Sequence, residues 1–269
     1  MTEFSWDALH DRYRTILCDV WGVIHDGVRV FPGAAARLRR WREEGRFVVL
    51  LTNAPRTADS VAGQLDRIGL PRSCWDAIVT GGEAGIEALS GLGHPVGFLG
   101  TDDDRSVLEG RGVRIGEGDD FFDLACSGLE EERPAVEQYG AQLAEWARRG
   151  VHFHCLNPDR VVVRGGRVEA CAGALADLYA ELGGSVVWYG KPHRAIYDHA
   201  LRVAGDPPLD QVLAVGDGLQ TDILGAARLR IDAVFVGGGI HAGEPFPADF
   251  ARTYGLGDWR PVACVDGLT

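Results

Sequence analysis

Short apolar runs alternate with amphipathic stretches along the first third of the chain. The runs at 15–18, 47–51 and 77–79 are typical of strands, and the unbroken run at 47–51 indicates a parallel strand buried on both faces. Between them, the apolar spacing predicts a helix from about 32 to 44 and a second helix that includes 61–68. This alternation predicts a parallel sheet with right-handed crossovers.

The same alternation returns near the end of the chain. Strands are predicted at 186–188, 212–215 and 233–236, and helices at 193–204 and 221–229. Because strand-helix-strand units add neighbouring parallel strands, these elements extend the same sheet. The two halves together predict a doubly wound, Rossmann-like α/β core.

The segment between the two halves carries elements of its own. Strands are predicted at 96–99, 121–126 and 151–154, and a helix at 136–146. We therefore expect an inserted α/β cap domain. The expected boundaries are 1–82 and 187–269 for the core and 83–186 for the cap, with hinges near Gly81, Gly82 and Gly184.

Charge and composition narrow the classes of partner. The 269 residues carry a formal net charge of -12, which argues against nucleic acid and against a membrane surface as partners. No run of about 18 apolar residues predicts a membrane span, and residues 1–14 lack the apolar stretch of a secretory signal. The six cysteines are scattered without close pairs, which is typical of reduced, buried thiols. Together these features favour a cytoplasmic protein.

Candidate chemistry lies where the predicted strands end. Asp19 follows the first strand and precedes a turn at Gly22, which places its carboxylate where open α/β sheets bind ligands. Thr52 and Asn53 end the next strand, where a hydroxyl and backbone N–H groups suit a phosphate oxyanion. A turn or a helix cap is the ordinary alternative for each of these residues.

Two further segments stand at the ends of later strands. Lys191 precedes a helix at the mouth of the sheet, where an ammonium neutralises a dianion, although a solvated lysine is the usual alternative. Asp217 and Asp222 follow the strand at 212–215, and two acidic groups aimed at a third form a hard oxygen site suited to magnesium. The alternative there is an Asp-Gly turn followed by a helix cap. All four segments nevertheless fall at strand ends, in one order.

That order resembles the haloacid dehalogenase-like phosphohydrolases. The four motifs of the family correspond here to Asp19-Val20-Trp21-Gly22-Val23, Leu51-Thr52-Asn53, Gly190-Lys191-Pro192, and Gly216-Asp217-Gly218 with Thr221-Asp222. The chain is most similar to the NagD-like branch, in which a large α/β cap lies between the second and third motifs. Further matches are His25-Asp26, Pro32-Gly33 and Leu156-Asn157-Pro158-Asp159.

The resemblance implies a role for each matched residue. Asp19 would attack phosphorus and form an aspartyl-phosphate, while Thr52 and Asn53 hold the phosphoryl group and Lys191 balances its charge. The implied cofactor is Mg²⁺, with Asp19, the backbone carbonyl of Trp21, Asp217 and Asp222 as its ligands. The implied activity is hydrolysis of a small phosphorylated metabolite, a sugar phosphate or a nucleotide. Self-association as a homodimer through the cap is a further expectation.

Position 21 departs from the pattern of the family. The family has a second aspartate there, which protonates the leaving alkoxide and then activates water. The indole of Trp21 transfers no protons near neutral pH. General acid–base help is worth ~10²–10⁴-fold in rate. Either His25 or Asp26 supplies the proton, or the substrate has a good leaving group, or the protein binds a phosphorylated ligand and turns it over poorly. Both Trp21 and His25 are predicted to contact the substrate. Trp21 itself would stack on a planar or sugar ring, or form a wall against the cap.

Two pairs of residues in the cap are further candidates. Asn157 and Asp159 match a loop that lies over the active site in the family, so both are predicted to bind substrate; the alternative is a plain Asn-Pro turn. His152 and His154 alternate on a predicted strand and share a face, where packing or solvent exposure is a better expectation than zinc. Three functions stay open: a phosphomonoesterase, which the retained nucleophile favours, a phospho-ligand-binding protein, and a phosphotransferase.

Overall fold

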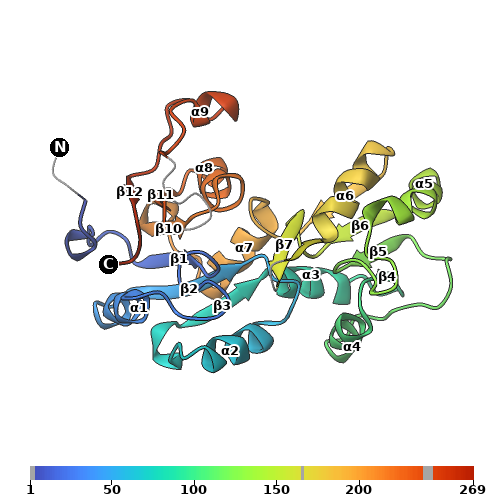
Figure 1. The fold of residues 1–269 in the computed structure, drawn as a ribbon, viewed down its shortest axis with the longest axis horizontal. Coiled ribbons are helices and arrows are strands. Elements are labelled where there is room, and N and C mark those ends of the chain that lie inside the picture. The colour runs from blue at the N-terminus through green and yellow to red at the C-terminus, as the bar shows by residue number, and fades with distance from the viewer. Residues whose placement is uncertain (1–3, 165–166, 239–244) are drawn as a thin grey trace. The chain divides into compact units, whose positions relative to one another are not determined.

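The computed structural model describes residues 4–164, 167–238 and 245–269. The chain divides into two compact units, each built on its own parallel sheet (Figure 1). The first unit comprises Met1–Thr52, Asp59–Val79 and Tyr197–Thr269, and the second comprises Asn53–Ala58 and Thr80–Ile196. The functional boundaries of core and cap, after 82 and before 187, stay a prediction, since compactness does not by itself define a functional domain.

The first unit contains a six-stranded sheet in the order β12-β11-β10-β1-β2-β3. Its strands are β1 Thr15–Asp19, β2 Phe47–Thr52, β3 Ala77–Thr80, β10 Val212–Gly216, β11 Asp232–Val236 and β12 Ala263–Val265. β1 pairs in parallel with both β2 and β10, so the chain leaves β1 in one direction and returns on its other side. Such a reversal of strand order is where open α/β sheets bind ligands, outside the carboxyl ends of the strands.

Helices of the first unit form where apolar residues recur at helical spacing. Those wholly or mostly in this unit are α1 Ala34–Glu43, α2 Ala58–Arg67, α7 Arg194–Val203, α8 Leu224–Leu229 and α9 Phe250–Thr253. In α1, the buried side chains are Ala34, Leu38 and Trp41, and the helix packs against β2. Full burial of a large apolar side chain contributes ~1.5–3 kcal/mol, so this stripe holds α1 on the sheet.

The second unit contains a four-stranded parallel sheet in the order β4-β5-β6-β9 and a separate antiparallel hairpin, β7-β8. The strands are β4 Gly97–Leu99, β5 Asp123–Cys126, β6 His152–Cys155, β7 Val161–Arg164, β8 Arg167–Ala170 and β9 Ser185–Trp188; the helices are α3 Gly81–Ser90, α4 Asp102–Gly110, α5 Gly140–Arg148 and α6 Ala172–Glu181. Alternate residues of β5 enter different apolar clusters. Leu124 packs with residues of α5 and α6, and Ala125 packs with residues of α3 and α4.

Five short helical segments complete the described secondary structure. Four are 3₁₀-helices, η1 Trp6–Ala8, η2 Arg72–Cys74, η3 Val136–Tyr139 and η4 Leu209–Gln211, and one is a π-helical turn, η5 Leu219–Ile223. η5 directly precedes α8, so the helix predicted at 221–229 begins with a π-helical turn. Such turns are frequent at functional sites.

The predicted fold class, an α/β protein with parallel sheets and flanking helices, is confirmed. One strand was assigned to the wrong sheet. We expected 186–188 to continue the sheet of the core, but β9 pairs with β6 in the second unit. An apolar run identifies a buried strand without identifying its neighbour. The pattern also did not predict the β7-β8 hairpin or helices α3, α4 and α6.

The cysteines follow the expectation for reduced thiols. All six are free; five are buried and Cys264 is exposed. Across the described residues, no helix has both the length and the apolar character that crossing a membrane requires.

Candidate active site

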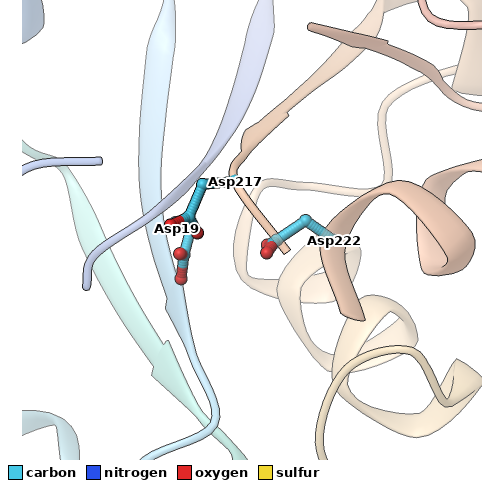
Figure 2. Close-up of side chains that lie close together, drawn as sticks. All are labelled: Asp19, Asp217 and Asp222. Atoms are coloured by element: carbon cyan, nitrogen blue, oxygen red, sulfur yellow. The ribbon is translucent and has the colours of Figure 1, made fainter. Parts of the chain in front are cut away.

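Three buried carboxylates meet in the first unit: Asp19, Asp217 and Asp222, which we call the aspartate triad (Figure 2). A carboxylate oxygen from each residue lies within 4.8 Å of one from each of the others. Their exposed fractions are 6%, 3% and 5%, respectively. Like charges gathered out of water disfavour one another, so this arrangement suits a divalent cation.

The triad forms where the strand order reverses. Asp19 is the last residue of β1, and Asp217 directly follows β10, its neighbour in the sheet. Cys18 pairs with Val215 in the register of β1 and β10, so Asp19 and Asp217 both lie at the carboxyl edge of the sheet. The two segments, nearly two hundred residues apart in sequence, are thus placed side by side by strand pairing alone.

Gly22 allows the chain after β1 to approach Asp217. Its φ of 83° lies in the left-handed region, and a Cβ at this position would stand 2.1 Å from Asp217 Oδ2. The Gly22 N–H donates to the carbonyl of His25 at 2.9 Å, which closes the turn. A residue with a side chain would therefore meet both backbone strain and a direct clash with the triad.

Asp222 is oriented by its own turn. Its Oδ2 accepts hydrogen bonds from the Gly218 N–H at 3.2 Å and from the Thr221 hydroxyl at 3.1 Å. Its backbone carbonyl accepts from the Tyr197 hydroxyl at 3.3 Å. The π-helical turn η5 thereby holds the third carboxylate toward the other two.

The residues present fit a magnesium ion. Carboxylate oxygens are hard ligands, and one or two of them with water and substrate oxygens are what Mg²⁺ prefers. Within 4–164, 167–238 and 245–269, the triad is the only group of three or more His, Cys, Asp or Glu side chains with ligand atoms this close. The backbone carbonyl of Trp21, predicted as a further ligand, is two residues beyond Asp19.

Trp21 packs partly against its own loop and is partly exposed. A Cβ on Gly27 would lie 2.3 Å from Trp21 Cη2, so the indole rests on the backbone of that glycine. The rings of Trp21 and His25 meet edge to face, with centroids 5.2 Å apart. The side chain remains 44% exposed, which leaves apolar ring surface for a ligand.

The two residues suggested as alternative proton donors both stabilise the loop after β1. His25 is 2% exposed, and its Nδ1 accepts the Gly27 N–H at 2.8 Å, so the neutral ring carries its proton on Nε2. Burial lowers the pKa of His25. Asp26 accepts the N–H groups of Arg29 and Val28, and these bonds lower the pKa of Asp26. Asp26 therefore stays ionised near neutrality and donates no proton there.

The remaining predicted residues begin at the end of β2. Thr52 ends β2 in the first unit, whereas Asn53, Lys191, Asn157 and Asp159 all belong to the second. Lys191 is 3% exposed and Asn53 6%, and Asn53 hydrogen-bonds both Lys191 and Asp159. The structure thus joins two sets of predicted residues: Asp19, Asp217 and Asp222 in the first unit, and Asn53, Lys191, Asn157 and Asp159 in the second.

Sequence patterns did not reveal a group of polar residues in the second unit, which we call the Asp123 cluster. It consists of Asp123, His94, His152, His154 and Tyr189. Asp123 Oδ1 lies 2.7 Å from His154 Nε2 and 3.4 Å from His152 Nδ1, and its Oδ2 lies 2.8 Å from His94 Nε2. The alternation of His152 and His154 indicated a shared face, but only the pairing of Asp123 with His152 across β5 and β6 supplies the carboxylate.

The protonation of this cluster follows from its hydrogen bonds. Burial raises the pKa of Tyr189 to about 12, so its hydroxyl donates to His154 Nδ1 at 2.8 Å. Burial lowers the pKa of His154, whose Nε2–H then donates to Asp123. Although burial acts to raise it, the pKa of Asp123 is lowered by the hydrogen bonds from His154 and His94.

Known proteins share both sequence and fold with this chain. Residues 16–114 match the family of haloacid dehalogenase-like hydrolases, and residues 188–259 match HAD-hydrolase-like proteins. A solved hydrolase of the haloacid dehalogenase-like family from Brucella suis is 34% identical, with a TM-score of 0.84 over 98% of each chain. This chain belongs to the haloacid dehalogenase-like hydrolases.

Curated relatives of this haloacid dehalogenase-like hydrolase lie in the expected branch. The acid sugar phosphatase of Staphylococcus saprophyticus is 25% identical over 86% of this chain and 89% of its own length. The ribonucleotide monophosphatase NagD of Escherichia coli is 25% identical over 84% of this chain and 88% of its own. The predicted resemblance to the NagD-like branch is confirmed. Both relatives are named as phosphatases, in keeping with the predicted enzyme class.

Proposed function

We propose that this chain is a Mg²⁺-dependent phosphatase of small phosphorylated metabolites that works through an aspartyl-phosphate on Asp19. The observation that carries the assignment is the aspartate triad, buried at the carboxyl edge of the sheet where strand order reverses. A nucleophilic carboxylate and a phosphate ester repel each other. A cation held by Asp217 and Asp222 beside Asp19 would offset that repulsion.

The proposed chemical step begins from the Asp19 carboxylate at this edge. A carboxylate oxygen of Asp19 attacks phosphorus, the bond from phosphorus to the ester oxygen breaks, and the leaving alkoxide takes up a proton from solvent water. Water then attacks the phosphorus of the acyl phosphate, the bond from phosphorus to the Asp19 oxygen breaks, and inorganic phosphate leaves as the Asp19 carboxylate is regenerated. The Thr52 hydroxyl and the backbone N–H groups that follow it are assigned to the phosphoryl oxygens, and Lys191 to their charge.

Sugar phosphates and nucleotides are the substrate classes that the named relatives suggest. Among the side chains predicted to bind substrate, Trp21 has the exposed ring surface to do so, at 44%. His25 and Asn157 are buried and hydrogen-bond their own loops. We therefore assign stacking against a base or a sugar ring to Trp21.

The test of this function compares Asp19→Asn with the natural chain. With p-nitrophenyl phosphate, turnover should require Mg²⁺, stop on addition of EDTA and be lost in Asp19→Asn. Asp11→Asn is the matched control, because the Asp11 side chain is 94% exposed and lies in the same unit. Metal-independent turnover, or turnover that survives in Asp19→Asn, would contradict the assignment.

The second candidate, a phospho-ligand-binding protein with weak turnover, rests on Trp21 in place of the usual acid–base aspartate. Since general acid–base help is worth ~10²–10⁴-fold, Trp21→Asp should raise kcat/KM on glycerol 3-phosphate by at least about tenfold. Trp21→Asn is the control of the same shape without a titrating group. Equal effects of both variants would mean that the gain is steric, and no gain in either would place the proton donor elsewhere.

A further inference from the structure

The side-chain amide of Asn53 is committed to two other segments of the second unit. Its Oδ1 accepts the backbone N–H of Lys191 at 2.6 Å. Its Nδ2 donates to the backbone carbonyl of Lys191 at 3.1 Å and to Asp159 Oδ1 at 2.8 Å. The network defines the orientation of the amide, since only the oxygen accepts an N–H and only the nitrogen donates to a carboxylate.

The pair of bonds to Lys191 holds both backbone polar groups of one residue. Lys191 is 3% exposed, and its long side chain extends from a backbone held on both sides by Asn53. A lysine ammonium is a point charge on a flexible stem of four carbons. Restraining the backbone at the base of that stem reduces the volume over which the charge is distributed.

Gly190 lets these segments approach one another. A Cβ at Gly190 would lie 2.6 Å from Asn53 Oδ1 and 2.3 Å from Pro158 Cδ. The backbone before Lys191 is therefore enclosed by Asn53 and by the loop that carries Asp159. Any larger residue at this position would push the two apart.

The backbone of Asp159 is held by hydrogen bonds of its own, independently of the contact with Asn53. Its backbone N–H donates to Asn157 Oδ1 at 3.1 Å, and its carbonyl accepts the Gly173 N–H at 3.1 Å. A Cβ on Gly173 would stand 2.6 Å from the Asp159 carbonyl oxygen, so α6 packs directly on this loop. The carboxylate of Asp159 is thus presented to Asn53 by a loop fixed on both sides.

We propose that Asn53 and Asp159 are positioning residues for Lys191, a unit that we call the Asn53 clasp. Asp159 fixes the amide of Asn53, and that amide fixes the backbone of Lys191, so Asp159 acts on turnover without touching the substrate. The clasp rests on the proposed function, in which Lys191 balances the phosphoryl charge. It assigns to Asp159 a role other than the substrate contact expected from the sequence.

The decisive measurement separates kcat from KM in variants of Asp159. With p-nitrophenyl phosphate and Mg²⁺, Asp159→Ala should lower kcat by roughly 10- to 100-fold with little change in KM, because it displaces a catalytic charge. Asp159→Asn should restore most of the loss, since its amide oxygen accepts the same hydrogen bond. A rise in KM with unchanged kcat would overturn the clasp and show a substrate contact instead.

A double-mutant cycle tests whether Asn53 and Asp159 act through the same contact with Lys191. Asn53→Ala combined with Asp159→Ala should lose no more activity than Asn53→Ala alone, because both changes release the same backbone. Losses that multiply would overturn the clasp. Asp120→Ala is the control: Asp120 lies at an exposed position of the same unit and should leave kcat unchanged.

A binding measurement covers the case in which the natural chain shows no turnover. The proposed function would then fail, but affinity for inorganic phosphate in the presence of Mg²⁺ still reports the placement of Lys191. Weaker binding in Asp159→Ala, restored in Asp159→Asn, would support the clasp. Equal affinity in all three proteins would overturn it.

Discussion

The buried carboxylates of the two units have opposite surroundings. In the second unit, Asp123 is 7% exposed and is hydrogen-bonded by His154 and His94, with His152 close by. In the first unit, the three carboxylates of the aspartate triad are between 3% and 6% exposed and face one another. The Asp123 cluster pairs one acid with hydrogen-bond donors, whereas the aspartate triad brings three acids together.

This difference in surroundings indicates that the aspartate triad, and not the Asp123 cluster, is suited to bind a cation. The imidazoles around Asp123 donate hydrogen bonds that stabilise its ionised form and lower the pKa of Asp123, so the cluster contributes to the stability of the fold. The triad brings like charges together, which raises the free energy of the folded state unless a cation offsets them. The cluster that gathers three acids is therefore the candidate for a metal site, whereas the one that pairs an acid with imidazoles is a candidate for a structural role.

The largest effect is expected where the backbone meets the triad. Gly22→Ala would place a Cβ 2.1 Å from Asp217 Oδ2, and should lower Mg²⁺-dependent turnover of p-nitrophenyl phosphate by roughly 100-fold. Gly45→Ala is the matched control, with a φ of 81° against 83° and no atom within 4 Å of its Cβ. Both variants should lose about 1–2 kcal/mol of stability to left-handed strain, but only Gly22→Ala should lose activity. Equal activities of Gly22→Ala and Gly45→Ala would show that Gly22 is required only for the conformation of the turn.

Removing one charge from each group should change stability in opposite directions. Asp123→Asn should lower the free energy of unfolding by about 1–3 kcal/mol, because it weakens buried hydrogen bonds to a charged acceptor. Asp217→Asn should raise it in EDTA, by on the order of 1 kcal/mol, because it relieves repulsion within the triad.

Urea unfolding with EDTA and with Mg²⁺ measures both changes. Added Mg²⁺ should stabilise the natural chain and Asp123→Asn but not Asp217→Asn, because stabilisation by a ligand requires its site. Asp120→Asn, at an exposed position, is the control. Destabilisation by Asp217→Asn in EDTA would mean that the triad contributes to folding as Asp123 does.

The smallest effect concerns the pH dependence of stability. Burial lowers the pKa of His154 and of His25, so the unfolded chain binds more protons than the folded one as pH falls through about 6.5. The free energy of unfolding should therefore decrease from about pH 7.5 to 5.5. His154→Gln should flatten this slope by at most about 1.4 kcal/mol per pH unit, whereas His10→Gln, at an exposed position, should not. A slope unchanged in His154→Gln would show that His154 is not held neutral.

The sequence by itself determined the elements at the active edge. Apolar runs located β1, β2 and β10, and the position of Asp19 and Asp217 at the ends of two of them predicted that their carboxylates meet. Local spacing suffices there, because the order of a parallel sheet brings carboxyl ends to one edge. Asp222 followed from its short distance in sequence to Asp217.

Only the tertiary structure decided which partners the other residues have. β9 was predicted as a strand of the core sheet but pairs with β6. The hydrogen bond between the Asn53 amide and Asp159, 106 residues away, was not predicted. Nothing in the spacing of the chain links Asp123 to His94 or places His25 out of solvent. A pattern along the chain records which side of an element is buried, whereas contacts between elements depend on packing across the whole domain.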